Sequence, residues 1–263
     1  MSIAPLPVPM HRRLVAEFLG TALLVAVVVG SGIAAEQLSP NDVGLQLLEN
    51  STATVFGLTI LILLFGPVSG AHFNPVVSAA DWLLGRRAGT GLTGSEVGAY
   101  SLAQTAGAIA GAVLANIMFD IDITELSGKD RTGSNLFVAE VVATAGLVAL
   151  IFALARTGRG ALAAPAVGAY IGAAYWFTAS TSFANPAVTV GRMFSDTFAG
   201  IDPTSVPGFI AAQLVGGLVG IAVVRYLFPD AASFADDVVV PHATATPGPT
   251  PEPTASTDTR SPR

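Results

Sequence analysis

Two Asn-Pro pairs stand out in this chain, because each follows a short run of small, turn-forming residues and precedes a short apolar run. Asparagine is a preferred N-cap, and proline is well tolerated at the first position of a helix. Each pair therefore predicts a loop that turns abruptly into a short helix, at about residues 75–84 and 186–194. An asparagine that caps through its side-chain oxygen keeps its NH₂ group free, so these stretches could donate hydrogen bonds. The two motifs comprise Asn74, Pro75 and Val76, and Asn185, Pro186 and Ala187.

The composition indicates a membrane protein. Of 263 residues, 52% are hydrophobic and only 11% are charged, whereas soluble domains carry about 25% charged residues. Apolar runs long enough to cross a bilayer recur along the chain. The first run, residues 14–35, follows Arg12 and Arg13 as in a signal peptide, but it lacks a cleavage-type ending and is interpreted as a span. The chain has no cysteine, which excludes disulfides and thiol catalysis.

Six spans and two re-entrant half-helices would give an all-α membrane fold. With this count, the arginines of the connections fall on one side, because each half-helix returns to the side from which it entered. Lys and Arg are in excess in cytoplasmic loops, so that side and both termini are predicted to be cytoplasmic. The expected spans are residues 14–35, 51–68, 96–119, 135–154, 162–178 and 206–228. The arginines are Arg12, Arg13, Arg86, Arg87, Arg156, Arg159 and Arg225.

The chain divides into a membrane domain, residues 1–228, and a tail, residues 229–263. The tail is rich in Pro, Thr, Ala and Ser, and it is predicted to be disordered because it cannot bury enough apolar surface to fold. The membrane domain consists of two repeats, about residues 12–127 and 132–228. Each repeat contributes three spans, an odd number, so the halves have opposite orientations in the membrane. Inverted repeats of this kind commonly form a pathway at the midplane.

Matched polar residues within the spans support the repeat. Glu17 and Glu140 each follow an alanine in the first span of their half, and Gln104 and Gln213 each begin a Gln-x-x-Gly-x-x-x-Gly pattern in the last span. The paired glycines would let helices approach closely. A carboxylate within a span is costly and usually has internal partners. One interpretation of the two acids is proton or ion coupling. The other, which we favour, is that each accepts hydrogen bonds from the backbone N–H groups of a half-helix loop.

Half-helices that enter from opposite sides would meet with their N-termini near the midplane. Each N-terminus carries about half a positive charge, and irregular backbone at that depth is tolerated only beside protein or a water-filled cavity. Donors and positive potential from both directions would repel cations. A water molecule that accepts hydrogen bonds from both Asn74 and Asn185 interrupts the chain of hydrogen-bonded waters along which a proton would move. The pattern predicts a pathway that passes neutral molecules and excludes protons and cations.

On these residues, the chain resembles the aquaporin, or major intrinsic protein, family. The two Asn-Pro motifs resemble the paired Asn-Pro-Ala signature of the family, and the run Ser-Gly-Ala-His-Phe before the first motif resembles its Ser-Gly-x-His-x. The Glu and Gln pairs within the spans also stand where the family pattern has them. The resemblance covers about residues 12–228. It implies six spans, two half-helices, a pore in each protomer and a homotetramer.

The chain departs from the family pattern beside the second motif. Val188 stands where the family usually has an arginine that narrows the pathway and adds positive charge. Thr189 stands where glycerol-conducting members usually have Asp, and Val76 replaces Ala in the first motif. Loss of the arginine predicts a wider and more apolar constriction, which passes small neutral solutes beside or instead of water.

The other constriction residues are assigned by resemblance. Phe56 resembles the aromatic residue of the second span, and Ser182 is the loop position. Tyr175 is our choice in the fifth span, although the register could shift to Ala174 or Trp176. Packing in the core or against lipid is the alternative role for Phe56 and Tyr175.

Arg192 lies four residues after Val188, so the two share a helix face and Arg192 lies about 6 Å further outward. It could return positive charge to an outer vestibule. The alternative is an i,i+4 salt bridge with Asp196. In the first half, Asp81 lies seven residues after Asn74, and it could mark the inner mouth or simply face water.

The leading functional prediction is a passive channel for water and small uncharged solutes, such as glycerol, urea or metalloid acids such as arsenite. The alternatives are an ion-coupled secondary transporter, with Glu17 and Glu140 carrying the coupling, and a junction-forming protein with a closed pore. An enzyme is not expected, because no nucleophile–base pair or metal-ligand spacing appears. We expect a plasma-membrane location, lipid, water and small solutes as partners, and no cofactor, metal or nucleic acid. The sequence does not identify the solute.

Overall fold

The computed structural model describes residues 8–123 and 125–229, which form helices and connections without a strand. Within these described residues, six helical segments are long and apolar enough to cross a membrane. The long helices are α1 (Met10–Leu38), α2 (Val43–Ser69), α4 (Gly94–Met118), α5 (Ser134–Arg156), α6 (Ala163–Phe177) and α8 (Val206–Leu227). The predicted all-α membrane fold is confirmed. The predicted tail, apart from Pro229, lies outside the described residues.

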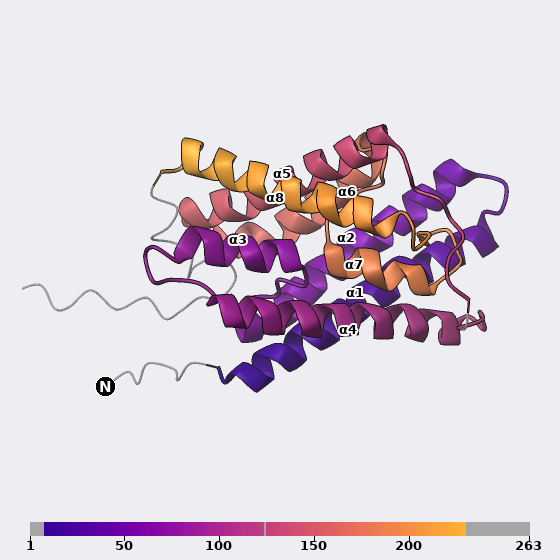
Figure 1. The fold of residues 1–263 in the computed structure, drawn as a ribbon. Coiled ribbons are helices and arrows are strands. Elements are labelled where there is room, and N and C mark those ends of the chain that lie inside the picture. The colour runs from indigo at the N-terminus through magenta and orange to yellow at the C-terminus, as the bar shows by residue number, and fades with distance from the viewer. Residues whose placement is uncertain (1–7, 124, 230–263) are drawn as a thin grey trace, which may run out of the picture.

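Two short helices lie at the positions of the expected half-helices. They are α3 (Pro75–Gly85) and α7 (Pro186–Gly191), and each begins at the proline of an Asn-Pro motif. A 3-10 turn, η2 (Arg192–Phe194), continues α7, and another, η1 (Gly160–Leu162), precedes α6. In Figure 1, α3 and α7 lie between the pair α5 and α8 on one side and the pair α1 and α4 on the other. The two Asn-Pro motifs therefore lie inside the bundle.

The second long helix begins earlier than the sequence predicted. The expected span started at residue 51, but α2 starts at Val43, where the side chain of Asp42 accepts a hydrogen bond from the N–H of Leu45 (2.9 Å). The added turns contain Gln46 and Asn50, and both are buried. Because these polar side chains point into the bundle and not toward lipid, the helix can extend through them. They also mark the inward face of α2.

Glycines allow the helix pairs within each half to approach at backbone contact. A Cβ atom on Gly111 of α4 would lie 2.1 Å from the carbonyl oxygen of Ala22 in α1. The second half repeats this arrangement, because a Cβ atom on Gly220 of α8 would lie 2.7 Å from the carbonyl oxygen of Ala145 in α5. Real Cβ atoms do not approach an oxygen so closely, so the matched glycines are required by packing.

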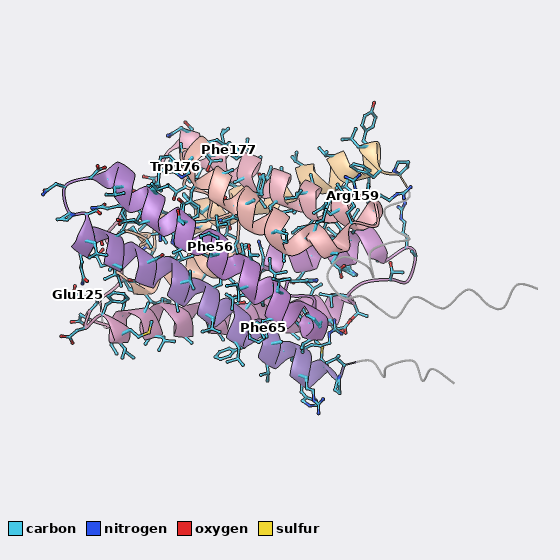
Figure 2. All side chains as sticks on the ribbon, turned by 180° about the vertical axis from the view of Figure 1, so that it is seen from behind. Phe56, Phe65, Glu125, Arg159, Trp176 and Phe177 are labelled. Carbon is cyan, nitrogen blue, oxygen red and sulfur yellow. The ribbon has the colours of Figure 1, made fainter. Side chains whose placement is uncertain are left out.

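The outer surface of the long helices is apolar. Large hydrophobic side chains such as Phe56, Ile60, Leu63 and Leu64 of α2 are exposed. Figure 2 shows Phe56 on the outward side of the bundle, with Trp176 near the end of α6. Lipid tails can cover such a surface without cost, as they would around a multi-pass membrane protein.

We predict that Gly111→Ala destabilises the protein by about 1–3 kcal/mol, because the added methyl group forces α4 away from α1. The measurement is the temperature at which detergent-solubilised protein loses its monodisperse elution peak. Gly98→Ala, in the same helix, is the matched control, since nothing lies within 4 Å of its added Cβ atom and alanine favours a helix over glycine. Equal melting temperatures for Gly111→Ala and the wild type would contradict the packing role.

Candidate functional site

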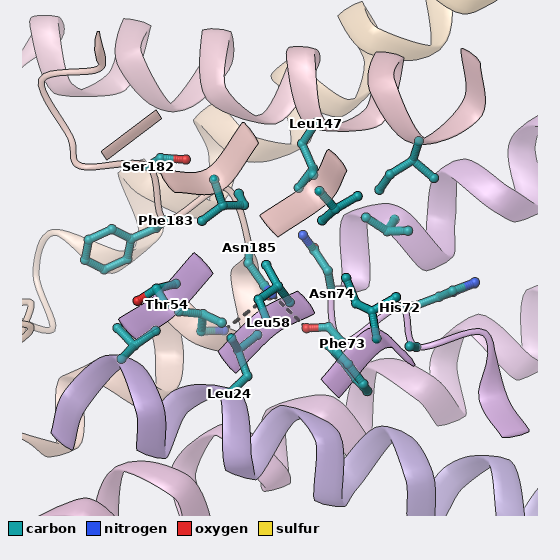
Figure 3. A pocket seen from close by; sticks show the side chains of 18 of the residues that line it. Leu24, Thr54, Leu58, His72, Phe73, Asn74, Leu147, Ser182, Phe183 and Asn185 are labelled. Carbon is teal, nitrogen blue, oxygen red and sulfur yellow. Dashed lines mark hydrogen bonds between the residues drawn. The ribbon is translucent and has the colours of Figure 1, made fainter. Parts of the chain in front are cut away.

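The two half-helix loops hold each other through their asparagines. Asn74 accepts the N–H of Val76 (3.0 Å) through Oδ1, and Asn185 accepts the N–H of Ala187 (3.0 Å) in the same way. Their amide nitrogens then cross to the opposite loop. Nδ2 of Asn74 donates to the carbonyl of Ala184 (2.8 Å), and Nδ2 of Asn185 donates to the carbonyl of Phe73 (2.7 Å). Each NH₂ group has a second proton, and both asparagines line the cavity described below (Figure 3).

Buried carboxylates bind the backbone of each loop. Glu17 accepts the N–H groups of His72 (2.9 Å) and Phe73 (2.7 Å) on separate oxygens. Glu140 accepts the N–H groups of Phe183 (2.9 Å) and Ala184 (2.8 Å) in the same arrangement. Both acids are fully buried. These are the contacts that the structural interpretation of the two acids requires.

The matched glutamines complete the two carboxylate sites. Gln104 donates to Glu17 (2.7 Å) and to Ser78 (3.1 Å). Gln213 donates to Glu140 (2.6 Å) and to the hydroxyl of Thr189 (2.9 Å). Thr189 is therefore part of this network.

The loops reach these carboxylates through unusual backbone conformations. Ala71 and Phe73 in the first loop, and Thr181, Ser182 and Ala184 in the second, have φ values between 48° and 60°. Non-glycine residues adopt this left-handed region at a cost of about 1–3 kcal/mol, and they keep it only where the surroundings enforce it. Successive N–H groups in such a turn converge on one anion. The carboxylate of the same half supplies that anion.

A cavity of about 70 Å³ lies between the half-helix loops and the long helices. Its wall is mostly aliphatic, and Figure 3 shows Leu24, Leu58 and Leu147 on it. A few polar groups interrupt this wall. They belong to Thr54, His72, Asn74, Tyr175, Ser182, Asn185 and Arg192. This composition suits a small solute with both carbon and hydroxyl surfaces.

Tyr175 and Ser182 line the cavity on the side of α7. The hydroxyl of Tyr175 lies 3.2 Å from Oγ1 of Thr54, and Ser182 Oγ is buried without a hydrogen-bond partner in the described residues. Trp176, the alternative register, is half exposed, and Ala174 is buried but does not line the cavity. The chosen register therefore brings Tyr175 to the cavity wall.

Phe56 does not line the cavity, and its assignment to the constriction is wrong. Its side chain is 65% exposed and points away from the bundle (Figure 2). Thr54 and Leu58, one turn apart, occupy the wall instead, and two residues after Thr54 the helix has rotated by about 200°. Gln46, Asn50 and Thr54 recur every four residues along α2 and are all buried, and this i, i+4 spacing is a signal that could have identified the inward face.

Val188 and Arg192 both line the α7 end of the cavity. The guanidinium carbon of Arg192 lies 3.5 Å from the centroid of the Phe183 ring, and its Nε donates to the carbonyl of Ala199. Arg192 is only 2% exposed. It forms no ion pair with Asp196 in the described part of the chain, so the structure favours the vestibule position over the salt bridge.

A second arginine, which the sequence did not single out, reaches the same ring. Arg131 comes from the connection between α4 and α5, and its guanidinium carbon lies 5.0 Å from the centroid of Phe183. Its Nε donates to the carbonyl of Gly200 (2.8 Å). Burial lowers the pKa of Arg131 to about 10, so the side chain stays charged at neutral pH. No local pattern predicts this position, because its partners lie far along the chain.

The opposite end of the cavity contains His72. Its Nδ1 lies 3.0 Å from Ser78 Oγ, and its ring contacts the edge of Tyr100. Tyr100 in turn accepts from Arg13 Nε (2.8 Å). Asp81 is buried and accepts the N–H of Leu92 (2.6 Å). Asp81 therefore holds the connection between α3 and α4 and does not mark a mouth of the cavity.

Six apolar spans around a cavity, closed by two inward half-helices, define a polytopic membrane channel. The major intrinsic protein family model matches residues 7–182. The chain belongs to this family.

Relatives agree with the family assignment. The chain is 51% identical over 220 residues to "Aquaglyceroporin AqpS" of Rhizobium meliloti (strain 1021), covering 84% of this chain and 91% of that protein. It is 32% identical over 234 residues to "Glycerol uptake facilitator protein" of Pseudomonas aeruginosa, covering 78% of this chain and 81% of that protein.

A solved structure shows the same fold. It is the aquaglyceroporin from Plasmodium falciparum, with a TM-score of 0.57 and 22% identity, covering 89% of this chain and 98% of that chain. The family and the relatives confirm the predicted activity: the protein is a passive channel for water and small solutes.

We predict that Glu140→Gln lowers stability by about 1–3 kcal/mol, because the new amide donors face N–H donors that then lack an acceptor. Thermal unfolding in detergent measures the loss. Glu125→Gln is the matched control, since Glu125 is exposed and lies on the surface in Figure 2. Ion coupling would be supported instead by two results together: wild-type stability of Glu140→Gln, and a solute flux that depends on the proton gradient in the wild type but not in this variant.

Proposed function

We propose that the channel passes small uncharged polyols, of about the size of glycerol, together with water. The observation that carries this proposal is the division of the cavity wall into two kinds of surface. Hydroxyl groups of Thr54, Tyr175 and Ser182 gather near the α7 end, and aliphatic side chains form most of the remaining wall. A polyol has hydroxyls along one edge and carbon along the other, so it matches both surfaces at once.

Ser182 gives the strongest local support. Its hydroxyl is buried without a partner in residues 8–123 and 125–229, and an unsatisfied buried polar group costs about 1–3 kcal/mol. A passing solute hydroxyl can pair with it. Val188 offers no hydrogen bond at the same level, so the solute keeps room for its carbon atoms. The names of the two relatives, an aquaglyceroporin and a glycerol uptake facilitator, support the same solute class.

The half-helices account for the exclusion of ions. The N-termini of α3 and α7 meet where the asparagine amides cross, and helix N-termini carry positive potential. Donors without nearby acceptors at this point interrupt a proton-conducting chain of waters. In this proposal, Asn74 and Asn185 form the ion barrier, while Val188, Tyr175, Thr54 and Ser182 set the solute size.

The setting in the cell is part of the proposal. The channel lies in the plasma membrane with both described ends cytoplasmic, so the α7 end of the cavity faces outward. The excess of arginines at the α3 end supports this orientation. Four protomers, each with its own pore, assemble through the exposed apolar helix faces. The protein catalyses no reaction.

Val188→Arg tests the size filter. The arginine would add bulk and charge beside Tyr175, and we expect glycerol permeability in proteoliposomes to fall by about tenfold or more, equivalent to at least about 1.4 kcal/mol of added barrier. Water permeability should fall less. Stopped-flow light scattering measures both, and Val188→Ile is the control that adds volume without charge. If Val188→Arg changes neither permeability, Val188 does not border the path.

Ser182→Ala tests the hydroxyl contact. The substitution removes one hydrogen bond to the passing solute, so glycerol permeability should fall by about threefold to tenfold relative to water. Ser101→Ala is the matched control, because Ser101 Oγ bonds the carbonyl of Val97 (2.8 Å) within α4, away from the cavity. An unchanged ratio of glycerol to water permeability in Ser182→Ala would reject this contact.

A further inference from the structure

Three cationic side chains gather at the α7 end of the cavity without a carboxylate partner. Arg131 and Arg192 both stack on Phe183, and Lys129 Nζ lies 4.7 Å from the centroid of the Phe198 ring. Within the described residues, none of the three forms an ion pair. Their hydrogen bonds go to backbone carbonyls. Lys129 and Arg131 share that of Phe198, at 2.7 Å and 3.3 Å.

Each of the two nearby carboxylates accepts a backbone N–H on one of its oxygens. Glu36, at the end of α1, accepts the N–H of Phe198 (2.8 Å). Asp196 accepts the N–H of Gly128 (3.0 Å). These acids shape the loops that carry the cations, but they do not pair with them. Three cations against these two carboxylates leave a net positive charge for a mobile anion.

The three cationic side chains are increasingly buried from the surface toward the cavity. Lys129 is exposed, Arg131 is partly buried, and Arg192 is buried and lines the cavity. The one hydrogen bond of the Arg192 guanidinium to described residues uses Nε, to Ala199, which leaves both terminal nitrogens as donors. Ser182, beside it on the cavity wall, contributes a buried hydroxyl without a partner. Guanidinium groups and a hydroxyl are donors that match an oxyanion.

We propose that Lys129, Arg131 and Arg192 bind a small oxyanion at the α7 end of the cavity, and that the bound anion obstructs solute passage. The aliphatic wall beyond Arg192 offers a charged ligand little compensation for lost water, so the anion stays at this end. The proposed anion binding depends only on the cationic cluster. The proposed obstruction of solute passage also depends on the solute pathway proposed above.

Titration calorimetry with sodium sulfate on the detergent-purified protein tests the site directly. We expect saturable binding to the wild type, and binding about tenfold weaker to Arg131→Gln. Sodium chloride at equal ionic strength should not reproduce the heat. Arg87→Gln is the control of equal charge change, because Arg87 is exposed beyond α3; it should bind sulfate as the wild type does.

The pH dependence provides a second readout. Burial first, and then Arg131 and Arg192, lower the pKa of Lys129 to about 8, while Glu36 and Asp196 act in the opposite direction. Lys129 therefore loses its charge between pH 7 and 9, and sulfate, whose charge is constant there, should bind less tightly at pH 9. Lys129→Gln should reduce this difference without abolishing it, because burial also lowers the pKa of Arg192. A wild-type affinity that is the same at both values of pH would remove Lys129 from the site.

The effect on transport is measured as glycerol flux into proteoliposomes with sulfate on both sides, against chloride at equal ionic strength. Sulfate should slow the wild type and Arg87→Gln but not Arg131→Gln. Equal sulfate affinity in Arg131→Gln and the wild type overturns the site. Sulfate binding with unchanged flux overturns the obstruction alone. Absence of glycerol flux in every protein overturns the proposed solute, while calorimetry still decides the anion site.

Discussion

The fold depends on the satisfaction of irregular backbone inside the bundle. Unpaired N–H and C=O groups at membrane depth are costly, and water cannot replace their partners there. The N–H groups of the two loops go to Glu17 and Glu140, and the carbonyls of Phe73 and Ala184 go to the asparagine of the opposite loop. Each half therefore completes the other. A half-helix loop in this chain has no complete set of partners without both repeats.

This arrangement separates the proposed ion barrier from the proposed solute filter. The asparagine pair is fixed by loop–loop hydrogen bonds and by the buried acids, none of which involves the side chain of Val188. The α7 end can consequently change its side chains while the midplane stays intact. A valine at position 188 fits the structure, because Val188 is buried within the main apolar core. Selectivity among neutral solutes can then vary without loss of the barrier to ions.

Sequence reasoning succeeded where a feature is local or repeated. The Asn-Pro motifs, the six spans and the matched Glu, Gln and Gly residues follow from periodicity and from the agreement of two halves. It failed at Phe56, because a short stretch of similar letters does not determine helical phase, whereas the polar residues Asn50 and Thr54 do. It missed Arg131, because this side chain reaches the cavity end through contacts with Phe183, Gly200 and Ser205, all more than 50 residues away in the chain.

The position of Arg192 explains how positive charge and an apolar constriction coexist. Stacking on Phe183 and the bond to Ala199 hold the guanidinium one helical turn beyond Val188. On the proposed path, a solute coming from the α7 end would meet charge first, where donors can replace part of its hydration, and would meet the valine afterwards. In a constriction that contained the arginine itself, charge and narrowness would act on the solute together. In the proposal, their separation lets the narrow part select neutral solutes by size and shape, while the cationic cluster binds anions before they reach it.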